Sequence, residues 1–187
     1  VATSAPNGYT LLVVAAGHAV NPALYKKLPY DTARDFVPVA QFGDGAYVFV
    51  AHPGAGVSSN TELIALAKAK PGQVTYASSS TGNLTHLAAE LFNSLAGIKM
   101  LHVPYKGGGL AVTGLLGNEV QLMIVNMISA KPQAQAGRIR PLAVAAPKRA
   151  AHLPNLFTTA EAGLPGYEVS QFYGIVAPAK TPKRILA

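Results

Sequence analysis

The stretch VTYASSSTGNLTHLAAELFNSLAG, residues 74–97, predicts a strand, a polar loop and a helix in immediate succession. The run VTYA at 74–77 has strand character, and Gly97 is typical of the residue that follows a helix end. The segment SSSTGN between them consists of small residues that favour a turn and then a helix start. A strand and a helix joined in this way are the building unit of an α/β fold.

The same alternation continues along the chain in both directions. Further strands are predicted at residues 9–15, 46–51, 99–103, 121–126, 141–145 and 172–177. The first of these is a continuous apolar run, which predicts a buried strand. Further helices are predicted at 59–70, 110–116 and 130–136, the first with Ser59 and Glu62 at capping-box spacing. This rhythm predicts an α/β fold whose sheet carries helices on both faces.

The composition narrows the classes of function. Half of the 187 residues are hydrophobic and 12% are charged, so the chain can bury a substantial core. The formal net charge is +7, but the basic residues are scattered, and only 7% of the chain is aromatic. Nucleic-acid binding is therefore an alternative that rests on net charge alone, and we expect none. The lack of cysteine excludes disulfides and cysteine-bound metals.

The polar loop is the leading candidate for a binding site. It consists of Ser78, Ser79, Ser80, Thr81, Gly82 and Asn83, placed before a helix that begins near Leu84. The first amides of a helix have no partner within the helix and carry a partial positive charge, so they can hold a carboxylate or a phosphate. Ligands of open α/β sheets also bind at the carboxyl ends of strands. The alternative interpretation is ordinary N-capping by Ser or Asn.

Two other segments place polar residues or glycines after a predicted strand. HVPYKGGG at 102–109 could form an anion-binding nest beside Lys106, or simply a flexible turn. The predicted loop at 17–22 carries His18, which could contact a ligand but is more typical of a surface residue.

Motifs of well-known enzyme classes are missing. The chain has no G-x-S-x-G elbow, no H-E-x-x-H, no P-loop and no G-x-G-x-x-G, so we expect no metal site, no cofactor and no catalysis. The enzymatic alternative is an α/β hydrolase that uses a serine of the 78–80 loop together with His86 or His102. For His86, a packed or capping role is the expected one.

Longer stretches match a known family in order and over essentially the whole chain. They are PNGYTLL at 6–12, GHAVNPALYKKLPYDTARDFVPV at 17–39, ELIALAKAKPGQVTYASS at 62–79, THLAAELF at 85–92, HVPYKGGG at 102–109, AGRIRPLAV at 136–144, KRAAHLPNLFTTAEAGLPGYE at 148–168 and FYGIVAPAKTP at 172–182. Together these stretches resemble the TctC-like, or Bug, family of substrate-binding proteins of tripartite tricarboxylate transporters.

The resemblance implies a type II periplasmic binding-protein fold, with two α/β domains around a cleft that closes on a small carboxylate. On that pattern, residues 1–51 and 169–187 belong to an incomplete first domain and residues 52–168 form the second. The family's opening strand would precede Val1, and its last helices would follow Ala187. The implied function is capture of a carboxylate for membrane transporter subunits in the periplasm, although no signal peptide occurs in this chain.

The resemblance also implies site residues. The SSSTGN loop takes the family's carboxylate-holding place, which favours binding over simple capping. The other implied ligand-binding residues are Gly17, His18 and Asn21 in a loop lining the cleft, Tyr105 and Lys106 in a turn at its edge, and Asn126 at a strand end. Ser80 stands where the family usually has glycine, and Val125 stands where members often have an acid. The second departure favours an apolar or aromatic carboxylate over an amino acid.

Overall fold

The computed structural model describes residues 1–150 and 153–186 of the chain. They form two compact units, unit 1 with Val1–Gly45 and Gln171–Ala187, and unit 2 with Ala46–Ser170. Residues 151, 152 and 187, which fall within the predicted domain ranges, lie outside the described residues. Among the described helices, none is both long enough and apolar enough to span a bilayer.

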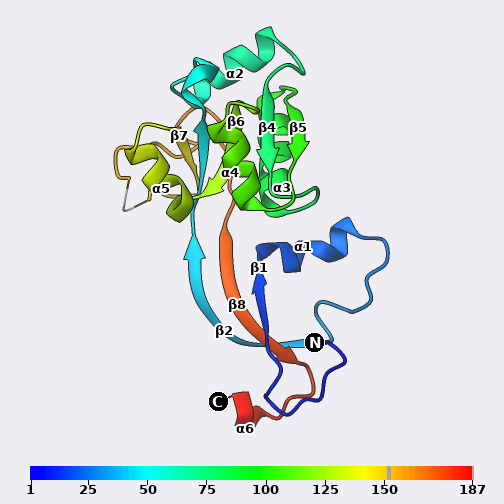
Figure 1. Ribbon diagram of the computed structural model, residues 1–187. Helices are drawn as coiled ribbons and strands as arrows, with labels where there is room; N and C mark the ends of the chain where they lie inside the picture. Colours follow the sequence, from blue (N-terminus) through cyan, green and yellow to red (C-terminus); the bar gives the residue numbers. More distant parts are fainter. Residues whose placement is uncertain (151–152, 187) are drawn as a thin grey trace. The chain divides into compact units, whose positions relative to one another are not determined.

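Unit 2 is built on a five-stranded mixed sheet with the strand order β5-β4-β6-β3-β7. Its strands are β3 (Tyr47–Ala51), β4 (Thr75–Ser78), β5 (Leu101–Pro104), β6 (Leu122–Asn126) and β7 (Arg140–Ala145). β4 runs parallel to β5 and β6, whereas β3 is antiparallel to β6 and β7. The carboxyl ends of β4, β5 and β6 therefore lie at one edge of the sheet, and each is followed by a helix (Figure 1).

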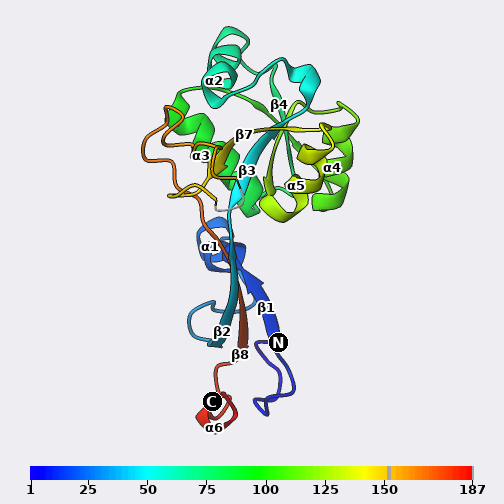
Figure 2. The same ribbon diagram turned by 90° about the vertical axis from the view of Figure 1, so that its left-hand side faces the viewer.

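Four α-helices cover the two faces of this sheet. They are α2 (Asn60–Ala69), α3 (Leu84–Ala96), α4 (Gly108–Leu116) and α5 (Met127–Gln135), and a short 3₁₀ helix, η1 (Pro53–Ala55), follows β3. Because side chains alternate along a strand, Phe49 of β3 packs with α2 and α3, while Val48 packs with α4 and α5. Figure 2 shows α3 and α4 on opposite sides of the sheet. The predicted α/β fold with helices on both faces is confirmed.

The core on the α3 side is centred on three aromatic rings. Phe49 is 2% exposed, and its ring centroid lies 4.7 Å from that of Phe92 and 5.5 Å from that of Tyr167. The Tyr167 hydroxyl, which is enclosed by this cluster, donates a hydrogen bond to the Ala88 carbonyl oxygen at 3.0 Å. A buried tyrosine needs such a partner, so the long segment between β7 and the end of unit 2 is anchored to α3.

The start of α2 follows the predicted capping pattern with one change. The Ser59 side chain accepts a hydrogen bond from the Glu62 amide at 3.2 Å, as an N-cap does. The Glu62 carboxylate, however, accepts from the Ser58 amide at 2.6 Å rather than from that of Ser59. The reciprocal bond of the capping box is thus displaced by one residue, and it still holds the chain entering the helix.

Unit 1 contains a three-stranded antiparallel sheet with the order β1-β8-β2. Its elements are β1 (Leu12–Ala15), α1 (Ala16–Leu24), β2 (Phe36–Gly45), β8 (Gln171–Pro178) and α6 (Lys183–Leu186). Figure 1 shows β8 lying between the other two strands. The last predicted strand, at 172–177, falls within β8.

Two expectations for unit 1 were wrong, and one of its strands was missed. The strand predicted at 9–15 is shorter and is not buried, because Tyr9 is 93% and Val13 is 65% exposed. The loop expected at 17–22 is part of α1, although Pro22 lies inside this helix. β2 was not predicted, because it carries Pro38 and two register shifts, features that strands tolerate at sheet edges.

Candidate ligand-binding site

A pocket of about 480 Å³ lies in unit 2 at the carboxyl ends of β4 and β6, where three helices begin. Its polar lining residues are Tyr47, Ser79, Thr85, Gly108, Gly109, Asn126, Ser129 and Gln133, and its apolar ones are Val112, Met123, Ile124 and Val125. None of these side chains carries a formal charge. A pocket of this size and polarity suits a small molecule held by neutral donors and by an apolar wall.

The polar loop contributes to this pocket through Ser79, but most of its polar groups bond to one another. Asn83 is the N-cap of α3, and its Oδ1 accepts hydrogen bonds from the His86 amide at 3.1 Å and from the Thr85 hydroxyl at 2.8 Å. The Asn83 Nδ2 donates to the Ser79 hydroxyl. These bonds tie the loop to the first turn of α3 and set the positions of Ser79 and Thr85 in the pocket wall.

Two amides of the loop donate to side chains in the first turn of α3. The Ser79 amide donates to the Thr85 hydroxyl at 3.2 Å, and the Gly82 amide donates to Nδ1 of His86 at 3.1 Å. Both amides already have acceptors, so in this conformation they are not free to hold an anion. Ser80 and Thr81, at the exposed turn of the loop, do not line the pocket.

The start of α4 supplies amides that have no acceptor within their helix. Gly107, the N-cap, has a φ of 116°, a conformation that side chains other than glycine rarely adopt, and its amide donates to the Ser79 carbonyl oxygen at 2.8 Å. Gly108 and Gly109 then form the first helical turn, where a helix provides no acceptors for its own amides. Both glycines line the pocket and both are exposed. The GGG segment thus directs the positive end of a helix dipole towards the pocket.

The third helix start is that of α5. Asn126 caps it, with Oδ1 accepting from the Ile128 amide at 2.8 Å, so this side chain both orders the helix and lines the pocket. The helix begins earlier than the predicted residue 130, which places Ser129 and Gln133 one turn apart on the pocket wall.

Tyr105 and Lys106 lie outside the lining of this pocket. The Tyr105 hydroxyl donates to the Glu119 carboxylate at 2.9 Å, and burial together with that carboxylate raises the pKa of Tyr105. Its ring lies against Gly114 of α4, where a Cβ would collide with the hydroxyl. Tyr105 thus connects β5 to α4, and Lys106 is exposed.

Gly17, His18 and Asn21 belong to unit 1, on helix α1. The His18 ring stacks on Tyr30 at 5.7 Å and meets the edge of Phe36 at 5.1 Å, and burial lowers its pKa. Asn21 donates to the Tyr30 hydroxyl at 2.9 Å. These contacts give His18 and Asn21 a packing role within unit 1, and their proposed ligand contacts stay a prediction.

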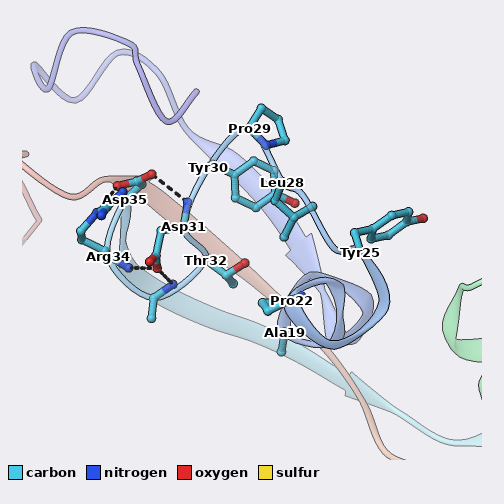
Figure 3. Close-up of a pocket in the computed structure, with 11 residues that line it drawn as sticks. Ala19, Pro22, Tyr25, Leu28, Pro29, Tyr30, Asp31, Thr32, Arg34 and Asp35 are labelled. Carbon is cyan, nitrogen blue, oxygen red and sulfur yellow. Dashed lines mark hydrogen bonds and ion pairs between the residues drawn. The ribbon is translucent and has the colours of Figure 1, made fainter.

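A larger pocket, of about 690 Å³, lies in unit 1 beside α1 (Figure 3). Its carboxylates are already satisfied: Asp31 accepts from the amides of Ala33 and Arg34, and Asp35 accepts from the Asp31 amide. Arg34 forms an ion pair with Asp35 at 3.0 Å, which lowers the pKa of that carboxyl group. Such mutual pairing is typical of a structural turn, so the smaller pocket of unit 2 is the stronger candidate.

The Ser78–His102 pair has the spacing that a hydrolase would require but the wrong direction of hydrogen bonding. Ser78 Oγ lies 2.6 Å from Nε2 of His102, and the single hydroxyl proton is donated to the Ser80 carbonyl oxygen at 3.0 Å. Nε2 of His102 must then be the donor, so it cannot accept the serine proton. Ser78 is also 0% exposed. This geometry disfavours the hydrolase alternative.

Sequence reasoning identified only part of the pocket. Ser79 and Asn126 were predicted, and Gly108 and Gly109 were noted as part of a glycine nest but not selected as site residues. Thr85, Ser129, Gln133 and Tyr47 were missed. Thr85 and Ser129 lie in the first turns of helices and Tyr47 at a strand end beside Asn126, which was a usable signal, whereas Gln133 lies one turn further along α5. The described residues contain no group of three or more His, Cys, Asp or Glu side chains that could hold a metal ion.

Solved structures share the fold of this chain, and two of them hold a carboxylate. One is that of R. palustris Rpa4515 with adipate, at 37% identity and a TM-score of 0.94, covering 100% of this chain and 62% of that one. Another is MatC from Rhodopseudomonas palustris with bound malate, at 30% identity and a TM-score of 0.91, covering 100% of this chain and 64% of that one.

The family follows from the whole sequence. The model of the TctC family, described as the tripartite tricarboxylate transporter family receptor, matches residues 1–187, and the chain belongs to this family. Protein BugT of Bordetella pertussis (strain Tohama I) is 37% identical over 187 residues, which are 99% of this chain and 57% of BugT. The chain thus spans little more than half the length of this curated relative.

Proposed function

We propose that the chain is the greater part of a periplasmic solute-binding protein that captures a small carboxylate for the membrane subunits of a tripartite tricarboxylate-type transporter. The observation that carries the proposal is the unit 2 pocket, in which the starts of α3, α4 and α5 present neutral donors at one place. The family membership and the related structures with adipate and malate support the same conclusion.

In this proposal the carboxylate lies at the start of α4. The amides of Gly108 and Gly109 are its principal donors, because their positions in the helix leave them without helical acceptors. The hydroxyl groups of Ser79, Thr85 and Ser129 line the same space and supply further donors. Of the loop residues, Ser78, Gly82 and Asn83 act indirectly, by holding Ser79 and Thr85 in place. The direct contacts expected for Ser80, Thr81, Tyr105 and Lys106 stay predictions.

The uncharged lining restricts the kind of carboxylate. An amino acid carries an ammonium group, which needs a carboxylate or several carbonyl oxygens when it is taken out of water. The pocket offers no acidic side chain, and Val125 is part of an apolar wall with Val112 and Met123. The proposed ligands are therefore carboxylates with an apolar body, without an amino group.

A thermal-shift screen of the full-length protein tests this function. We expect at least one mono-, di- or tricarboxylate to raise the melting temperature, since a ligand that binds only the folded state at about 100 times its Kd adds about 2.7 kcal/mol of stability. Matched amines and uncharged sugars should leave the melting temperature unchanged. Stabilisation by sugars or cations with no response to any acid would contradict the proposal.

A further inference from the structure

A stack of three aromatic rings lies beside the polar loop of unit 2. It consists of Tyr76 on β4, His102 on β5 and His86 on α3, with ring centroids 5.0 Å apart for Tyr76 and His102 and 4.0 Å apart for the two histidines. The two imidazole planes are inclined by only 22°. Two imidazolium cations at this separation would repel each other, so the arrangement favours at most one positive charge.

Each imidazole holds a different part of the 78–83 loop. At the start of the loop, Nε2 of His102 donates to Ser78 Oγ at 2.6 Å, as the single serine proton requires. Near its end, Nδ1 of His86 accepts a hydrogen bond from the Gly82 amide at 3.1 Å. Nδ1 of His86 must therefore be unprotonated, because an N–H group there would point at the amide proton. The His86 contact exists only with a neutral ring.

We propose that His86 and His102 are positioning residues, which hold the loop in its binding shape as neutral imidazoles and loosen it when the pair takes up a proton. The inference rests on the proposed carboxylate-binding function, because Ser79 of this loop and Thr85 beside it line the pocket. Neither histidine lines the pocket itself, so both act through the residues that they hold.

The groups that face the histidine pair come from β4 and α3. On β4 these are the hydroxyl groups of Tyr76 and Ser78, and on α3 the Glu90 carboxylate, whose Oε1 accepts from the Tyr76 hydroxyl at 2.5 Å. Burial, and next the nearby His86, lower the pKa of His102 from its usual 6.5, and Glu90 opposes them without reversing the shift.

The sign of the pH dependence follows from this lowered pKa. His102 binds its proton less readily in the folded chain than in the unfolded one. Its stabilising contribution is therefore complete above its usual pKa of 6.5 and is lost as the pH falls through the lowered folded value. Because the Gly82 contact also needs a neutral His86, acidification should weaken both the loop and the binding of the carboxylate.

The test compares the full-length wild type with His86→Asn, using adipate and malate as probes, between about pH 7.5 and about pH 5, a range that spans the ordinary titration of histidine. Asparagine places Oδ1, an acceptor that does not titrate, where Nδ1 stands. From the value of one hydrogen bond, we expect the wild type to lose about fivefold to tenfold more affinity on acidification than the variant. Protonation of the acids themselves affects both proteins alike.

A matched control is His52→Asn. Nδ1 of His52 also accepts an amide hydrogen bond, from Gly54 at 3.0 Å, but this contact lies at η1 and not at the pocket. The carboxylate affinity of His52→Asn should depend on pH in the same way as that of the wild type. Equal pH profiles for the wild type and His86→Asn, or a rise in wild-type affinity on acidification, would overturn the proposal.

A second readout separates this inference from the proposed function. Protection of the Gly82 amide from hydrogen exchange, corrected for the intrinsic rate, should fall on acidification in the wild type but not in His86→Asn. If no carboxylate of the thermal-shift screen binds at any pH, the proposed function fails, while the Gly82 amide still decides whether the histidines hold the loop. Unchanged Gly82 protection in the wild type would overturn the positioning role.

Discussion

Replacing Gly109 by aspartate is expected to weaken carboxylate binding at least about 30-fold without destabilising the fold. The loss of affinity is expected because two like charges about 4 Å apart repel each other by about 4 kcal/mol at an effective dielectric constant of 20, before screening by salt. Gly109 lines the pocket, and a Cβ added there meets nothing within 4 Å. An acidic residue in the first turn of α4 is also favoured by the helix dipole, by about 0.3–1 kcal/mol. Affinity and stability should therefore change in opposite directions.

The matched control is Gly109→Asn, which has nearly the shape of aspartate but no charge. It should bind the carboxylate selected by the thermal-shift screen within about threefold of the wild type, since a neutral side chain in open space costs little. Both variants are to be measured by isothermal titration, and their unfolding by urea. If Gly109→Asp binds as tightly as Gly109→Asn, the anion does not lie at the start of α4.

The largest expected loss of stability is that of Phe49→Ala, at about 3–5 kcal/mol, as is usual for a buried phenylalanine truncated to alanine. Phe49 is 2% exposed and contacts both Phe92 and Tyr167, so its removal leaves a cavity between β3, α3 and the segment that leads to β8. The urea midpoint should fall with little change in slope, because the surface exposed on unfolding stays nearly the same.

Phe42→Ala provides the comparison for this loss. Phe42 is 59% exposed on β2, and its truncation should change the free energy of unfolding by less than about 1 kcal/mol. Equal losses for the two variants would mean that the aromatic cluster is not the centre of the core.

The fold of unit 2 could be predicted from the sequence because its apolar runs and capping residues agree with the way its elements pack. The run at 46–51 is apolar without interruption, and β3, which occupies 47–51, is buried at every residue in the middle of the sheet. Gly97 and Asn83 are the residues at which α3 ends and begins. The edge strand β2 was missed since Pro38 and its bulges break the strand pattern, and only pairing with β8 makes it a strand.

The site could be predicted from the sequence less well than the fold, because its chemistry depends on which donor bonds to which acceptor. The sequence displays Ser78, Ser79 and Asn83 as a row of polar groups, but not that they bond mainly to one another and to α3. Likewise, His86 and His102 are far apart in the chain, and they meet because β5 pairs with β4 beside α3. The proposed domain limits and the direct ligand contacts of the loop stay predictions.

An NMR titration of the full-length protein with a carboxylate that stabilises it in the thermal-shift screen tests the central claim most directly. Saturable downfield shifts of the Gly108 and Gly109 amide protons are expected, because those groups would donate to the bound carboxylate, while Gly56 and Gly72, outside the pocket, should not shift. Saturable binding of that carboxylate without any change at Gly108 and Gly109 would contradict it.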